Sequence, residues 1–572
     1  MKSEFPPERV RELYARGTAF KDNLNLYETV RRNERFYTGD QWYGLKVKKI
    51  QPVVLNVLRR VVGTFQAMVV SDDIAFEITP FTADEGRETI GKALEEAVKA
   101  VIEKQKIKTK NRKCIRTGAT TGDMCMYFWF DPDIETGQRM KGDIAAEVLL
   151  GTNVIFGNPY TADVQKQPYI ILVQRRPAEE VRREAREAGN PDWERIESDS
   201  GQEYLGEEDG CTELCTVLTV LWKTKKPVMD EELGVQTGTR ACVCFKRVAG
   251  KVELTGDTET GMSLYPVAWA NWLERLNCMH GISPLTEAIP TQIAINKQAT
   301  NIISFTRNLA FPKIVYDSRK FPNGWDSSPG TAVAVAGNPQ ELVTNLIGGV
   351  NMPAGVVDVL KLMIDLMKDC LGASDATLGD VRPENTSAIL AAQSASNAPL
   401  ELQKRTFEQF NEDCIRIIVD MMCAYYGERV VMVRQRVTDP MTGMETEEEA
   451  PAALDVTPDA GRGTMRAGGE ALPAALDFGA LDFGAMDINV EVGAASYWSQ
   501  TLAVTNLDRL MEQQLLPDVL TYFENIPAQL LPNKREIIRK AREKMQRGQS
   551  PGGALGGRLA EGTRPEKGME TV

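Results

Sequence analysis

Side chains able to carry out catalytic chemistry are sparse in this chain. It contains one histidine, His280, among 572 residues, so a site that needs two imidazoles as zinc ligands is excluded. His280 stands directly before Gly-Ile-Ser-Pro, and neither a Gly-x-Ser-x-Gly nor a Cys–His pattern surrounds it. Both a catalytic and a structural role are open to His280, and its context favours the structural one.

Two cysteine pairs resemble metal ligands only in part. Cys211 and Cys215 are separated by three residues, and Cys242 and Cys244 by one, so neither pair has the two-residue spacing of a zinc knuckle. Apolar and polar residues alternate around both pairs, which puts each pair on one face of a strand. The pattern therefore predicts reduced, partly buried strand thiols rather than a metal site.

A third group, Asp131, Asp133 and Glu135, begins like a calcium loop but lacks the other ligands and the closing glutamate of an EF-hand. The spacing favours a solvated hairpin turn. Nucleotide chemistry is not indicated either, because no Gly-x-x-x-x-Gly-Lys-Ser/Thr sequence is present. We therefore predict a protein that is not an enzyme and holds no metal or cofactor.

Composition sets further limits. The chain is 42% hydrophobic and 26% charged, as in ordinary globular proteins, and it is long enough for several domains. No apolar run approaches the roughly 18 residues of a membrane helix, and the N-terminal stretch lacks the apolar core of a secretory signal, so we expect a cytoplasmic origin. The net charge of −13 argues against a protein that binds nucleic acid over its whole surface, because such proteins are usually basic. It is compatible with a protein past which DNA slides, because an acidic surface repels phosphate.

The elements that would position these residues are of mixed type, so we predict an α+β fold. A helix-period segment covers residues 7–37, and strands dominate residues 211–270. Two helices, 281–308 and 353–372, bracket a small β element, and a long helix covers about 387–426. The apolar face of the helix over 353–372 is so wide that it predicts contacts on more than one side.

The helix over 281–308 has an unusual surface. Ser283 and Pro284 are placed as N-cap and first helical residue, and Pro290 must either kink the helix or move its start to Thr291. Isoleucines alternate with Gln, Asn and Lys along the helix. We expect the isoleucines to pack within the subunit and the polar side chains to meet neighbouring subunits or a water-filled channel.

The C-terminal part carries an insertion at 438–486 with an acidic run, "ETEEEA". The strands on either side of it, "RVVMVRQRV" and "DINVEV", predict that it is a decorated hairpin loop. A basic helix, 534–547, follows later, and the Gly-rich segment 548–572 is predicted to be disordered.

Five segments occur in an order that resembles the portal proteins of tailed bacteriophages, over about residues 25–545. They are "RNERFYTGDQW", "QPVVLNVLRRVVGTFQAM", "VIFGNPYT", "HGISPLTEAIPTQIAINKQ" and "INVEVGAASYWSQ". The resemblance is to the larger portals with a C-terminal crown, and the insertion at 438–486 departs from the pattern.

The resemblance implies a homo-oligomeric ring, typically of twelve subunits, at the portal vertex of the virion capsid and made in the host bacterial cytoplasm. Double-stranded DNA would pass through its channel, driven by terminase. A head–tail adaptor, scaffold and the major capsid protein would be further partners, and no membrane is involved. The implied parts are a wing (1–280 and 387–500), stem helices (281–309 and 352–372), a clip (310–351), a tunnel loop (373–386), a crown (501–547) and a tail (548–572).

The same resemblance assigns site residues by position. The DNA channel would be lined by Asn296, Lys297, Asn301, Arg307, Asp380, Arg382 and Glu384. Terminase or adaptor would contact the clip at Asp317, Arg319, Lys320, Trp325 and Asp326. Packaged DNA would meet the crown helix at Lys534, Arg535, Arg539, Lys540 and Arg542.

Alternatives remain open for these assignments. Lys297, Arg307 and Arg382 either form basic rings in an acidic channel or make salt bridges to neighbouring subunits, and the basic helix either meets DNA or is a solvated face. For the whole chain, the alternatives are another virion component, such as an adaptor or capsid protein, and a DNA-processing enzyme with an unfamiliar site.

Overall fold

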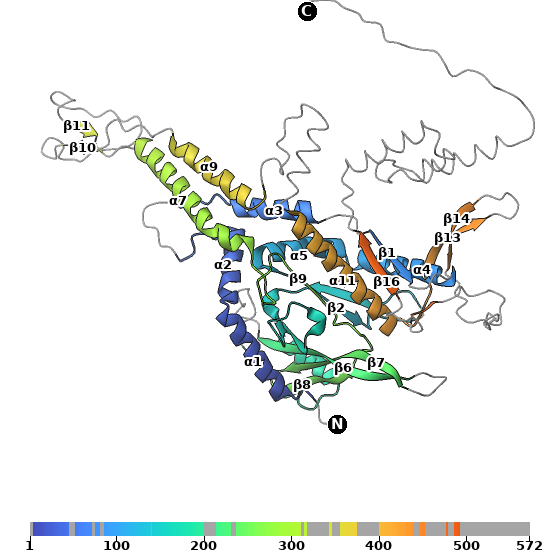
Figure 1. Ribbon diagram of the computed structural model, residues 1–572. Coiled ribbons are helices and arrows are strands. Elements are labelled where there is room, and N and C mark those ends of the chain that lie inside the picture. Colours follow the sequence, from blue (N-terminus) through green and yellow to red (C-terminus); the bar gives the residue numbers. More distant parts are fainter. Residues whose placement is uncertain are drawn as a thin grey trace, which may run out of the picture. The chain divides into compact units, whose positions relative to one another are not determined.

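The computed structural model describes residues 4–44, 52–70, 75–80, 85–138, 140–199, 213–229, 236–310, 314–316, 343–345, 355–373, 400–438, 445–451, 476–478 and 486–491 (Figure 1). The chain divides into two compact units, Met1–Val492 and Gly493–Val572, and all described residues belong to the first. The crown and tail predicted from the sequence lie outside the described residues. The described elements mix helices and sheets, as the α+β prediction requires.

A five-stranded antiparallel sheet forms one part of the first unit. Its strand order is β4 (Val154–Phe156), β5 (Tyr169–Pro177), β6 (Leu214–Met229), β7 (Gln236–Ala249) and β8 (Val252–Glu259). Helices α1 (Pro7–Asn23) and α6 (Ala178–Glu187) contribute to separate apolar clusters on this sheet. Along β6, Leu218 and Val220 belong to the α1 cluster and Val217 to the α6 cluster. Successive side chains of a strand point to opposite faces, so the two helices cover the two faces.

A three-stranded antiparallel sheet lies at the main core. Its central strand β2 (Asp123–Asp131) has β3 (Asp143–Val148) on one side and β9 (Val267–Asn271) on the other. Helices α5 (Ile107–Thr121) and α11 (Glu401–Tyr425) contact this sheet. Phe407, Phe410, Cys414 and Ile417 of α11, spaced three and four residues apart, are all buried and form the core face of that helix.

The acidic group after β2 is a turn, as predicted. Strands β2 and β3 pair as an antiparallel hairpin, and the backbone N–H of Asp133 donates to Asp131 Oδ1 at 3.0 Å. Lys141 Nζ lies 3.4 Å from a carboxylate oxygen of Glu135. Two of these carboxylates, those of Asp131 and Glu135, therefore have partners within the hairpin itself.

The N-terminal helical segment is broken, contrary to the single run predicted over 7–37. Helix α1 ends at Asn23 and α2 (Leu26–Thr38) begins after Asn25, whose φ of 51° is left-handed. Asparagine tolerates this conformation better than most residues because its side chain is short and polar. The periodicity on either side of Asn25 gave no sign of the break.

The hairpin predicted around the acidic insertion is wrong. Strand β13 (Met432–Thr438) pairs with β14 (Glu445–Pro451), which contains the acidic run, and β16 (Met486–Glu491) pairs with β1 (Ala75–Pro80). The register sets Arg434 opposite Glu449 and Arg436 opposite Glu447. Opposite charges at facing positions favour a pairing, and the short loop between β13 and β14 costs less closure entropy than a connection across the whole insertion.

Further elements complete the described part of the chain. Helices α3 (Val57–Val69) and α4 (Glu85–Lys104) precede α5, and β12 (Glu428–Arg429) pairs with β15 (Leu476–Asp477). Helices α7 (Pro284–Ala310) and α9 (Gly355–Cys370) run side by side in Figure 1. Between them in sequence, β10 (Ile314–Tyr316) pairs antiparallel with β11 (Val343–Asn345), so two helices do bracket a small β element.

Candidate functional site: the paired helices α7 and α9

The start of α7 is fixed by its cap. Ser283 Oγ accepts a hydrogen bond from Leu285 N at 3.1 Å and donates to Ala119 O at 2.7 Å, while Pro284 is the first helical residue. This confirms the predicted N-cap and N1 residues. Pro290 lies inside the helix rather than at its start, so it removes one backbone hydrogen bond from the second turn.

One polar stripe of α7 is buried against the segment that leads into α3. Gln292, Asn296 and Thr300 recur at every fourth position and are buried. Their side chains accept hydrogen bonds from alternate backbone N–H groups of the segment Val53–Val57. The bonds are Val57 N to Gln292 Oε1 (3.2 Å), Leu55 N to Asn296 Oδ1 (3.0 Å) and Val53 N to Thr300 Oγ1 (3.1 Å). We call these three residues and that segment the clasp.

The clasp corrects the assignment of Asn296 to a channel surface. Its side chain is 1% exposed, and its Nδ2 donates to Gln41 Oε1 at 2.5 Å. The amide is therefore used within the subunit, because a buried amide must find partners for both its oxygen and its nitrogen. The regular four-residue spacing of Gln292, Asn296 and Thr300 was visible in the sequence, but nothing there pointed to residues 53–57.

Other polar side chains of α7 are open to solvent. Lys297, Asn301 and Arg307 are exposed on the subunit, so α7 offers two cationic groups and an amide to whatever it faces. Asp380, Arg382 and Glu384 of the expected tunnel loop, all five clip residues from Asp317 to Asp326 and the five crown residues from Lys534 to Arg542 lie outside the described residues.

Helix α9 is apolar on two sides. Met367 is buried, and Leu360, Met363 and Ile364 pack against the main core. Val359, Leu362 and Leu366, at spacings of three and four residues, are half or more exposed, at 50%, 57% and 53%. The second set forms an apolar stripe that is exposed within the described part of the chain, in agreement with the wide face predicted from the sequence.

The single histidine is part of a buried junction that sequence reasoning did not identify. His280 Nδ1 lies 2.8 Å from Asp123 Oδ2, and Gly281 N donates to Asp123 Oδ1 at 2.7 Å. Asp123 begins β2 and Gly281 precedes α7, so this carboxylate ties the central sheet to the start of the helix. Both His280 and Asp123 are buried, and the ring of Trp269 meets the imidazole edge to face at 5.6 Å.

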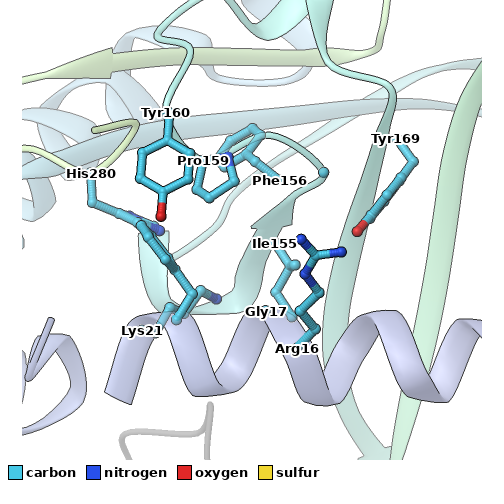
Figure 2. A pocket seen from close by; sticks show the side chains of 11 residues that line it. Arg16, Gly17, Lys21, Ile155, Phe156, Pro159, Tyr160, Tyr169 and His280 are labelled. Carbon is cyan, nitrogen blue, oxygen red and sulfur yellow. The ribbon is translucent and has the colours of Figure 1, made fainter. Parts of the chain in front are cut away.

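A small hollow of about 100 Å³ borders His280 (Figure 2). Lys21 lines it from α1, and its amine donates to Thr152 O at 2.5 Å. Among the described residues, the lining contains no serine, threonine, cysteine or carboxylate, which are the groups that a histidine base most often activates or is oriented by. The contact that the structure gives His280 is the structural one to Asp123.

Three of the cysteines considered as metal ligands lie in the described strands β6 and β7. Cys215, Cys242 and Cys244 are free and buried, as predicted for strand thiols, whereas Cys211 lies outside the described residues. Burial raises the pKa of Cys215 and Cys244. No group of three or more His, Cys, Asp or Glu side chains suited to a metal occurs in the described ranges. None of the helices described there has both the length and the apolar character needed to cross a bilayer.

A comparison with protein families shows which family the chain belongs to. A family model described as phage P22-like portal protein matches residues 17–551, which is nearly the whole chain. The chain belongs to this portal protein family. As a portal protein it serves packaging and ejection of phage DNA, and membership implies an oligomeric ring at a capsid vertex that works with terminase, capsid and DNA. The family is structural rather than catalytic. A search of curated proteins gave no significant match.

Proposed function

We propose that α7 and α9 are the stem of the portal and that their exposed faces form the channel wall and the contacts between subunits. The observation that carries this proposal is the pair of helices itself, which lie side by side and bracket the small β10–β11 sheet in the chain. The stem would comprise 281–309 and 352–372, the clip 310–351 and the tunnel loop 373–386. The wing would comprise 1–280 and 387–500, and the crown 501–547.

The exposed residues of the two helices support different roles for α9 and α7. The apolar stripe of α9, Val359, Leu362 and Leu366, suits contact with the next subunit, because apolar side chains gain most from removal from water. Lys297, Asn301 and Arg307 of α7 suit a wet surface past which phosphates move. In a ring of about twelve chains of charge −13, a few cationic side chains would act against an acidic background.

The other assigned residues complete the proposal. The clip residues Asp317, Arg319, Lys320, Trp325 and Asp326 would contact terminase and then the head–tail adaptor. Arg382 would add a basic ring at the tunnel loop, between Asp380 and Glu384. The crown helix would meet packaged DNA through Lys534, Arg535, Arg539, Lys540 and Arg542. A channel of this kind needs no cofactor of its own, because terminase supplies the energy.

Negative-stain microscopy of the purified full chain, alone and with scaffold protein, tests the proposal. We expect closed rings with a central hole wide enough for duplex DNA. Shells or filaments in place of rings would contradict it. A metal-dependent nuclease assay on the same preparation tests the competing assignment of a DNA-processing enzyme, and we expect no cleavage.

A further inference from the structure

The clasp works because two different periodicities coincide. Four residues of an α-helix rise about 6 Å, close to the roughly 6.6 Å that two residues of extended chain can span at most. Side-chain acceptors at every fourth position of α7 can therefore meet every second N–H of the segment Val53–Val57, including its last one, Val57 N, which also donates to Leu55 O at 2.9 Å where the chain turns into α3. Gln292 Nε2 also donates to Leu55 O at 2.6 Å and to Asn296 Oδ1 at 3.0 Å, so the ladder binds carbonyl as well as N–H groups.

The clasp is continuous with the turn that follows α2. Asn296 Nδ2 donates to Gln41 Oε1, and Gln41 Nε2 donates to Phe36 O at 2.8 Å. Trp42 Nε1 donates to Val53 O at 3.1 Å. The "GDQW" sequence thus has a physical role: its glutamine and tryptophan hold the clasp to the end of α2, and Gly39, with a φ of 106°, allows the chain to turn there.

Pro290 divides the buried part of α7 into two anchors. Before it, Ser283, Leu285 and Ile289 are buried in the main core region. After it, the three clasp residues are buried beside Ile295, which belongs to the main core, and Ala299. Because the proline ring interrupts the backbone hydrogen bonds between these anchors, bending at this point costs less than elsewhere in the helix. The direction of the helix beyond Pro290 then depends on what holds it from the side.

We propose that Gln292, Asn296 and Thr300 are positioning residues that hold the part of α7 beyond Pro290 against residues 53–57 and so set the direction in which the stem helix leaves the wing. The clasp itself is a property of the subunit, whereas its consequence for the channel rests on the proposed function. When the clasp opens, three backbone N–H groups and the helix behind them are released together, and Pro290 is the point about which the helix bends.

Hydrogen–deuterium exchange on the full-length chain tests the clasp directly. Thr300→Val keeps the side-chain shape but removes the acceptor of Val53 N, and we expect exchange in the peptide covering residues 52–57 to become roughly tenfold faster, the effect of losing one hydrogen bond. Thr306→Val is the matched control, because exposed Thr306 makes the same bond to the fourth preceding carbonyl, at 2.9 Å to Ile302 O, as Thr300 makes to Asn296 O at 2.7 Å. Thr300→Ser restores the hydroxyl and should restore slow exchange.

A double variant tests whether Pro290 is the hinge, that is, the point about which α7 bends. Pro290→Ala restores the missing backbone bond, so the exchange increase caused by Thr300→Val should be smaller in Pro290→Ala/Thr300→Val than in the single variant. A purely local packing defect would give the same increase in both backgrounds. Equal exchange in the Thr300→Val and Thr306→Val chains, or equal increases with and without Pro290, would overturn the proposal.

Cryo-electron microscopy connects the clasp to the ring. In rings of the Asn296→Leu chain we expect the segment beyond Pro290 to change direction relative to the sheets, and in Thr300→Val rings to a smaller degree. An unchanged direction in both variants would overturn the positioning role. If the unsubstituted chain forms no ring, the proposed function fails instead, while the exchange experiments on the subunit still decide whether the clasp and hinge exist.

Discussion

At the scale of single residues, Asp123 makes the junction between the central sheet and α7. Its two carboxylate oxygens are used by Gly281 N and by the imidazole of His280, and it is buried. Gly122 beside it has a φ of 98°, and an added Cβ would come within 2.9 Å of the backbone of Gly281. The backbones at Gly122 and Gly281 therefore lie too close together for any residue larger than glycine at position 122.

Replacing Asp123 should be costly for stability. Asp123→Ala leaves a buried N–H and an imidazole without their acceptor, so we expect the free energy of unfolding to fall by about 3 kcal/mol. Asp133→Ala, in the exposed turn, is the control and should change stability by less than about 1 kcal/mol. Denaturant titration of the purified chain measures both. Similar midpoints for the two variants would show that the junction is not held by Asp123.

A second residue-scale prediction concerns pH. Burial raises the pKa of Asp413 to about 6, and the nearby carboxylates of Glu412 and Asp163 add to this, while the hydrogen bond from Gln409 and the charge of Arg416 act against it. The folded state therefore holds this proton more tightly than the unfolded state, whose aspartates titrate near 3.9. Between about pH 4 and pH 6, Asp413 makes stability fall as pH rises.

Asp413→Asn removes this titration. We expect the variant to equal the unsubstituted chain near pH 4 and to exceed it by about 1–2 kcal/mol at pH 7.5, after allowance for the water that still reaches the side chain. Unfolding measured at a series of pH values gives both curves. Parallel curves from pH 4 to 7.5 would mean that the carboxyl of Asp413 has an ordinary pKa.

At the scale of elements, local signals predicted the start of α7 and the β2–β3 turn, but neither the break between α1 and α2 nor the pairing of β13 with β14. The cap at Ser283 and Pro284, the β2–β3 turn and the buried face of α11 follow from neighbouring residues alone. The partners of Asn296 and of β16 did not, because they lie more than 200 and 400 residues away in sequence. An isolated sequence shows that a polar stripe needs partners, but not whether a neighbouring subunit or a distant segment of the same chain supplies them.

The uncovered stripe of α9 leads to an element-scale prediction. Leu362→Asp and Leu366→Asp should leave the subunit as stable as before, since both side chains are already exposed, but should weaken ring assembly, because burying a leucine contributes about 1.5–3 kcal/mol. Lys361→Gln, an exposed position on the same helix, changes the net charge by the same single unit and serves as the control. Native mass spectrometry gives the assembled fraction. Normal assembly of both leucine variants would place the subunit contact elsewhere.

At the scale of the whole molecule, the proposed channel carries a few cationic residues in a chain whose net charge is −13. Lys297→Ala and Arg307→Ala in α7, and Arg382→Ala in the expected tunnel loop, should alter the rate of DNA packaging or the packaged length by about twofold or more, and the effect should shrink as salt rises. Packaging assays and genome sizing measure this. Lys361→Ala on α9 serves as the control.

Two other outcomes of that experiment are informative. If the variants lose ring assembly rather than packaging, these side chains pair with neighbouring subunits. If both the rate and the length remain normal in assembled rings, the cationic side chains have no role in the passage of DNA.

The clasp also bears on how such a chain avoids aggregation. Residues 53–57, "VVLNV", include three β-branched valines, and residues 53–56 form neither a helix nor a paired strand, so their backbone groups could pair with the same segment of another copy. Three of the N–H groups are already occupied by side chains of α7. By occupying them, α7 makes this segment less available for pairing between copies, which leaves other surfaces to bring the subunits together.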